Sequence, residues 1–109
     1  DSYRKVVYTV PEHFQLVLMS LNPGEKIECE VHKETVQFFR VEKGEANITV
    51  NGKEYAIGDG ESFVIPPNTP HCVENVTKKG NKKLKLYTIY TPPEHPPNRH
   101  QRREPKKVK

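Results

Sequence analysis

The sequence predicts a single-domain, all-β protein, and three observations support this prediction. Apolar and polar residues alternate along most of the chain with a period of two, which is the period of a half-buried strand. The apolar segments are short, and Pro, Gly, Asn and Asp separate them at intervals of about 8–12 residues. No window of eleven residues shows an apolar helical stripe. About nine such strands in a chain of 109 residues indicate a sandwich, barrel or jelly roll.

The strands are identified in order from this alternation and from the turns between them. The strongest turn signal is Asn51-Gly52, because a type I′ hairpin needs a positive φ at both central residues. We expect strands at residues 5–10, 14–21, 26–31, 36–43, 45–50, 53–57, 61–65, 71–76 and 83–91.

The second of these segments, FQLVLMSL, is apolar at nearly every position. A strand of this composition is covered on both faces. A small domain cannot cover both faces of every strand, so we expect a second subunit to cover the outer face of this one. The sequence therefore predicts a homodimer. The outward set at this interface is either Val17, Met19 and Leu21 or Leu16 and Leu18.

The net charge of +4 comes from the C-terminal end of the chain. Residues 98–109 carry six basic residues and one acidic residue, a charge of +5, whereas residues 1–97 carry 12 basic and 13 acidic residues, a charge of −1. We expect residues 1–97 to form one barrel with an N-terminal strand and a proline-rich strap, in which His95 is a surface residue or reaches over the barrel mouth. Residues 98–109 are expected to be a solvated basic tail. Nucleic acid or an acidic partner could bind only through that tail.

Composition also bears on the expected location. No apolar stretch approaches the ~20 residues of a membrane span, and no secretory signal pattern opens the chain, so we expect no membrane partner. Two cysteines, Cys29 and Cys72, are too few for a disulfide framework. We therefore expect a cytoplasmic protein in which both are reduced structural thiols, with a cross-strand disulfide or a redox role as the alternative.

Residues that can bind a metal ion concentrate in two turn-and-strand segments. With a period of two, Glu30 and His32 lie on one face of their strand, while Gln37 and His71 each share a face with apolar residues of later strands. If the fold brings these faces together, two imidazoles and one carboxylate form a facial set that leaves positions open on a divalent ion. Gln37 would supply an amide oxygen as a fourth ligand or as a hydrogen-bond partner of the ligands.

The spacing of these residues resembles the first sequence motif of the cupins. In that motif a glycine is followed, after five residues, by two histidines separated by one residue. A glutamate stands three or four residues further on, and a second glycine after six more. This sequence has Gly24, Glu30, His32, Gln37 and Gly44 at these positions. Glutamate thus replaces the first histidine and glutamine replaces the glutamate, and the ligand charge stays at −1, which is compatible with a divalent ion.

The second cupin motif has a glycine, a proline, a further glycine, a histidine and an asparagine at fixed spacing. This sequence has Gly60, Pro66, Asn68, His71 and Asn75 at those positions. Asn68 replaces a glycine, and asparagine tolerates the left-handed backbone conformation that glycine usually serves. The segment LKLYTIYTPPEHPP is also similar to the end of small stand-alone cupins loosely labelled mannose-6-phosphate-isomerase-like.

The resemblance implies a cupin-type double-stranded β-helix, or jelly-roll barrel, with a divalent metal ion at Glu30, His32, Gln37 and His71. Fe, Mn, Ni and Zn all suit imidazole and carboxylate ligands. The implied function is sugar-isomerase or dioxygenase chemistry on a small oxygen-rich substrate. A non-catalytic cupin that binds a small ligand, a polar barrel mouth without metal, and binding through the basic tail are the alternatives. The sequence contains no P-loop, dinucleotide fingerprint or nucleophile elbow, and it identifies no second acid–base residue.

Overall fold

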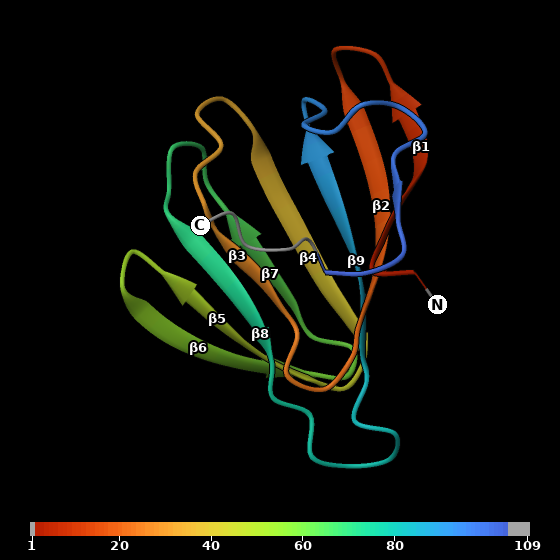
Figure 1. Ribbon diagram of the computed structural model, residues 1–109. Coiled ribbons are helices and arrows are strands. Elements are labelled where there is room, and N and C mark those ends of the chain that lie inside the picture. Colours follow the sequence, from red (N-terminus) through yellow and green to blue (C-terminus); the bar gives the residue numbers. More distant parts are fainter. Residues whose placement is uncertain (1, 105–109) are drawn as a thin grey trace, which may run out of the picture.

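The computed structural model describes residues 2–104, and Figure 1 shows two antiparallel sheets that face each other. In spatial order, the six-stranded sheet contains β10 (His100–Gln101), β1 (Arg4–Val10), β2 (Phe14–Leu21), β9 (Leu84–Thr91), β4 (Val36–Lys43) and β7 (Ser62–Ile65). The four-stranded sheet contains β3 (Lys26–Glu30), β8 (His71–Asn75), β5 (Glu45–Val50) and β6 (Lys53–Gly58).

The predicted all-β class is confirmed, and each of the nine expected strands is present to within one residue at either end. Within residues 2–104 no helix is long and apolar enough to cross a membrane.

The hydrophobic core lies between the two sheets. Along β2 the side chains of Val17, Met19 and Leu21 are buried, whereas Leu18 is 46% exposed on the outer face. The first of the two outward sets allowed by the sequence is therefore wrong, because the inner face of β2 packs against the four-stranded sheet. The largest fully buried apolar side chains are Tyr90, Phe39, Leu21, Ile48, Ile65, Leu84, Val17, Val41 and Val73.

Turn geometry follows the sequence signals. Asn51 and Gly52 have φ values of 50° and 79°, as the hairpin between β5 and β6 requires. Asn68, which occupies the glycine position of the second cupin motif, has a φ of 58°. Asparagine thus provides the left-handed conformation that the turn before β8 needs.

The C-terminal segment differs from the solvated tail that the charge pattern predicts. After β9 the chain crosses the end of the six-stranded sheet and returns beside β1 (Figure 1), where β10 pairs with Arg4 and Lys5. The N–H of Val6 also donates to the carbonyl of Arg99 at 2.8 Å. Without β10, β1 would be an edge strand along its whole length, and the returning chain pairs with the backbone of its first three residues. A strand of two residues has no periodicity by which the sequence could reveal it.

The basic residues Lys106, Lys107 and Lys109 lie outside the described residues. The expected contact of the tail with nucleic acid or an acidic partner therefore remains a prediction.

Candidate metal centre

The antiparallel pairing of β3 with β8 brings three of the predicted metal ligands together. Glu30, the last residue of β3, is the register partner of His71, the first residue of β8, and His32 follows two residues after Glu30. One ligand atom of each side chain lies within 4.8 Å of the others. His71 and His32 are 1% and 8% exposed, and Glu30 is partly buried.

The fourth predicted residue, Gln37, reaches the same place from β4 in the opposite sheet. Its Oε1 lies 3.0 Å from Nε2 of His71, and its Nε2 donates to Oγ1 of Thr88 at 3.0 Å. Gln37 and Thr88 are both buried. The structure therefore brings together all four residues that the sequence singled out.

The hydrogen bonds of His71 determine where its lone pair points. Nδ1 lies 2.9 Å from the carbonyl oxygen of Thr69, which can only accept, so Nδ1 carries the proton. Burial lowers the pKa of His71 and favours the neutral ring, although the bond to Thr69 acts in the opposite direction. In the neutral ring Nε2 is an acceptor, and it faces the Gln37 oxygen, which is also an acceptor. Two lone pairs that converge in this way suit a shared cation.

Glu30 and His32 present a second pair of converging atoms. Oε1 of Glu30 and Nε2 of His32 are 3.2 Å apart, yet both atoms are buried without a hydrogen bond of acceptable geometry. Burial opposes ionisation of both groups. The Glu30 carboxylate nevertheless raises the pKa of His32, with help from Glu94, and His32 lowers the pKa of Glu30. The structure thus places a carboxylate oxygen and an imidazole nitrogen where one ion would satisfy both.

The donor set fits a divalent transition metal. Ligand atoms that each bind one ion at about 2.1 Å lie about 3 Å apart when they are neighbours in the coordination sphere. The separations of 3.0 Å and 3.2 Å within the two converging pairs agree with this spacing. Two imidazole nitrogens and two oxygens are donors that Fe, Mn, Ni and Zn all accept.

The turn before β8 supports both histidines through the backbone. The N–H of Asn68 donates to the carbonyl of His32 at 2.7 Å, and the Thr69 carbonyl accepts the Nδ1 proton of His71. A turn with a left-handed residue at Asn68 aims both groups inward. The second cupin motif therefore helps to position the candidate ligand His32 as well as supplying His71.

Sequence reasoning missed Glu94 in the proline-rich strap, although it allowed His95 of the same strap to reach over the barrel mouth. Oε2 of Glu94 lies 3.4 Å from Nδ1 of His32, on the side of the ring away from Glu30. His95 packs edge-on against Tyr90, with the ring centres 5.1 Å apart, so it is half-buried beside the site rather than on the surface. A Glu-His pair between prolines matches no motif, and its only signal was its place in a segment that follows the last barrel strand.

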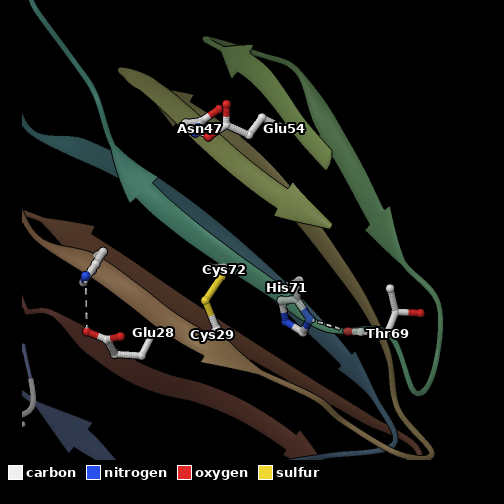
Figure 2. Close-up of a disulfide and its surroundings, with 8 residues drawn as sticks. Glu28, Cys29, Asn47, Glu54, Thr69, His71 and Cys72 are labelled. Atoms are coloured by element: carbon white, nitrogen blue, oxygen red, sulfur yellow. Dashed lines mark hydrogen bonds and ion pairs between the residues drawn. A yellow bond between two sulfur atoms is a disulfide. The ribbon is translucent and has the colours of Figure 1, made fainter. Parts of the chain in front are cut away.

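The expectation of reduced thiols is wrong, because Cys29 and Cys72 form a disulfide between β3 and β8 (Figure 2). The sulfur atoms point away from the metal ligands, as the alternation along the strands predicts. Each cysteine nevertheless adjoins a ligand in the chain, Glu30 in one strand and His71 in the other. The cysteines therefore no longer support the expected cytoplasmic location.

Comparison with known proteins adds independent support for the fold and the motifs. A family model described as a cupin domain matches residues 17–90. The uncharacterized protein L612 of Acanthamoeba polyphaga mimivirus is 46% identical over 99 residues, which cover 87% of this chain and 59% of that protein. Quercetin 2,3-dioxygenase of Bacillus subtilis is 32% identical over 97 residues, which cover 77% of this chain and 28% of the enzyme.

Among solved structures, BH2720 from Bacillus halodurans superposes with a TM-score of 0.86 and 32% identity, covering 94% of this chain and 79% of that one. The chain spans little more than half the length of L612 and about a quarter of the length of the dioxygenase. The facing sheets, the two spaced motifs and the match over residues 17–90 agree. The chain belongs to the cupin family.

Proposed function

We propose that the protein binds a divalent transition-metal ion through Glu30, His32, Gln37 and His71 and uses it to bind a small oxygen-rich molecule. The observation that carries this proposal is the cluster of Glu30, His32 and His71, whose ligand atoms lie within 4.8 Å of one another. Within it, Oε1 of Glu30 and Nε2 of His32 form a buried pair 3.2 Å apart whose geometry is poor for a hydrogen bond. Buried polar atoms normally have a well-formed hydrogen bond, and a cation bound between these two atoms would satisfy both.

When bound, the ion would supply Lewis-acid polarisation of a carbonyl or hydroxyl oxygen, and iron or manganese would add redox chemistry with O₂. The similarity to a region of quercetin 2,3-dioxygenase favours dioxygenase chemistry. An isomerase needs a separate acid–base group beside the ligands. Glu94 also contacts His32, but it lies on the Nδ1 side of the ring, away from Glu30, so it does not supply such a group at the proposed ion.

Metal analysis of protein purified without chelator tests the first half of the proposal. We expect about one equivalent of a transition metal per chain, lost in His71→Ala because one imidazole, one carboxylate and one amide hold a divalent ion weakly. His13→Ala, in the turn between β1 and β2, is the matched control and retains the metal. Full metal content in His71→Ala would place the site elsewhere.

The second half is tested with iron-reconstituted protein and a panel of catechols, flavonols and sugar phosphates. Dioxygenase chemistry predicts uptake of O₂ with a substrate that presents two neighbouring oxygens, and no uptake in His71→Ala. Tight binding of a panel member without O₂ uptake or isomerisation would support the non-catalytic alternative, a cupin that binds a small ligand.

A further inference from the structure

The strap after β9 is held at a defined place by a buried glutamine. Oε1 of Gln15 accepts the backbone N–H groups of Glu94 and His95 at 3.2 Å and 3.0 Å, and its Nε2 donates to the carbonyl of His95 at 2.7 Å. Gln15 is fully buried in β2. Because the oxygen and the nitrogen of this amide both bond to the backbone of residues 94–95, they hold that backbone in place. The position from which the Glu94 side chain extends is therefore fixed as well.

The carboxylate of Glu94 is held at both oxygens. Oε1 lies 3.0 Å from the hydroxyl of Thr35, a residue that is 2% exposed, and Oε2 lies 3.4 Å from Nδ1 of His32. The Glu94 side chain is 31% exposed, so its negative charge retains partial hydration while it faces the ring. This geometry makes the His32 side of the site dependent on a residue that is far away in the chain.

A neutral imidazole has one N–H, and the partner of one nitrogen decides which nitrogen carries it. Glu94, 3.4 Å from Nδ1, favours the Nδ1–H tautomer, whereas Glu30 beside Nε2 favours the other tautomer, and an ion bound between Nε2 and Glu30 removes that competition. In the Nδ1–H tautomer the lone pair is on Nε2. That lone pair faces Oε1 of Glu30 at 3.2 Å. In His71 the carbonyl of Thr69 accepts the Nδ1 proton and so favours the same tautomer. A carboxylate therefore acts on one imidazole and a backbone carbonyl on the other.

We propose that Glu94 is a positioning residue for His32, which it holds in the tautomer and orientation that present Nε2 to the metal ion. This inference rests on the proposed metal-binding function. Carboxylates that hold the second nitrogen of a metal-bound histidine typically contribute 10–100-fold in metal affinity. The charges of a divalent ion, Glu30 and Glu94 sum to zero, whereas the ion and its four proposed ligands alone carry a net charge of +1.

The test compares Glu94→Gln with wild type in the full-length chain, using cobalt(II) as the probe and its visible absorption as the readout. We expect cobalt affinity to fall about 10–100-fold. Glu34→Gln, which removes the same charge at a nearby exposed position, is the matched control and is expected to bind like wild type. Equal cobalt affinity in Glu94→Gln and wild type would overturn the proposal.

A second measurement separates this inference from metal binding itself. In metal-free protein at alkaline pH, the ¹⁵N shifts of the His32 ring report which nitrogen is protonated, with His32→Gln to assign the signals. Because Glu30 also competes for the proton at Nε2, we expect a larger Nδ1–H population in wild type than in Glu94→Gln. Equal tautomer populations in wild type and Glu94→Gln would refute the positioning role, even if the protein binds cobalt.

If wild type binds no metal but the Nδ1–H population of His32 falls in Glu94→Gln, the proposed function fails while the role of Glu94 toward His32 stands. Should Glu94→Gln fail to fold, Thr35→Val removes one of the two contacts of the carboxylate and provides the same comparison. It is expected to weaken cobalt binding in the same direction and by a smaller factor. Unchanged affinity and tautomer in Thr35→Val would then count against the proposal.

Discussion

At the scale of single residues, the exchange between Glu30 and Gln37 keeps one carboxylate at the candidate metal site. A glutamate at position 37 would place a second carboxylate in a site where Gln37 is only 1% exposed. Two carboxylates that share a buried site repel each other, which is costly in the absence of a metal ion. The neutral amide avoids this repulsion, and it still directs an oxygen at His71.

The strap histidine makes the stability of the metal-free protein depend on pH. Burial lowers the pKa of His95 from 6.5 to about 4, and the positive charge of Arg4 acts in the same direction. Between these two values the unfolded chain binds a proton that the folded chain does not. The contribution of His95 is therefore fully present above the unfolded pKa of 6.5 and is lost as the pH falls toward about 4.

We expect His95→Phe, which keeps a ring against Tyr90, to be less sensitive to acid than wild type over this window. The measurement is the free energy of unfolding against pH in the presence of chelator, and the difference between the two proteins removes the contributions of other groups. His13→Gln serves as the control and is expected to follow the wild-type profile. Parallel profiles for His95→Phe and wild type would contradict the assigned burial of His95.

At the scale of strands, the decisive feature is an irregularity in the pairing of β3 with β8. Ile27 pairs with Val73, but Glu30 pairs with His71, so β3 contains one extra residue between these two pairs. The burial pattern agrees, because Ile27 is buried and the next two residues are both exposed. After the bulge, Cys29 stands opposite Cys72. Without it, Cys29 would stand opposite His71, and the disulfide could not form.

The disulfide joins residues that are 43 positions apart, and it ties an edge strand to its neighbour beside two candidate ligands. A cross-link of this kind stabilises a protein by roughly 2–4 kcal/mol, in large part by restricting the unfolded chain. We expect the double variant Cys29→Ser, Cys72→Ser to lose roughly that free energy of unfolding, as measured by urea denaturation. A phosphine reductant is expected to destabilise wild type by a similar amount and to leave the double variant unaffected. An effect of the reductant on the variant, or none on wild type, would speak against the bridge.

At the scale of the whole molecule, the outer face of the six-stranded sheet is the surface most suited to a second subunit. A pocket of about 410 Å³ on this face is lined in part by Leu18 and Tyr87. Leu18 in β2 is 46% exposed, and Val64 in the edge strand β7 is 53% exposed. Apolar groups spread over one sheet face indicate an interface. The homodimer predicted from residues 14–21 is therefore proposed for this face.

Light scattering during size-exclusion chromatography tests the proposal. The expected mass is about 25 kDa, twice the 12.6 kDa of one chain. Leu18→Lys places a charge in the proposed interface and is expected to give a monomer. Val31→Lys introduces the same charge at a position that is also 46% exposed but lies in the loop after β3, and it is expected to remain dimeric. A wild-type mass near that of one chain would exclude the dimer at the concentration used.

The sequence by itself determined the fold class, the strands and the inward faces that carry Glu30, His32, Gln37 and His71. These features are local, because the period of two and the turn residues specify which side chains share a face. The two spaced motifs added which of those faces meet, and the match over residues 17–90 confirms the family to which they point.

Only the tertiary structure decided the Cys29–Cys72 disulfide, the contact of Glu94 with His32 and the return of β10 to β1. Each depends on a relation between distant parts of the chain. The disulfide depends on a bulge that shifts the register of β3 against β8. The Glu94 contact depends on Gln15, about 80 residues away, which holds the strap. The pairing of β10 depends on the returning chain reaching the edge of β1. Local patterning carries no information on such pairings, because packing across the whole barrel selects them.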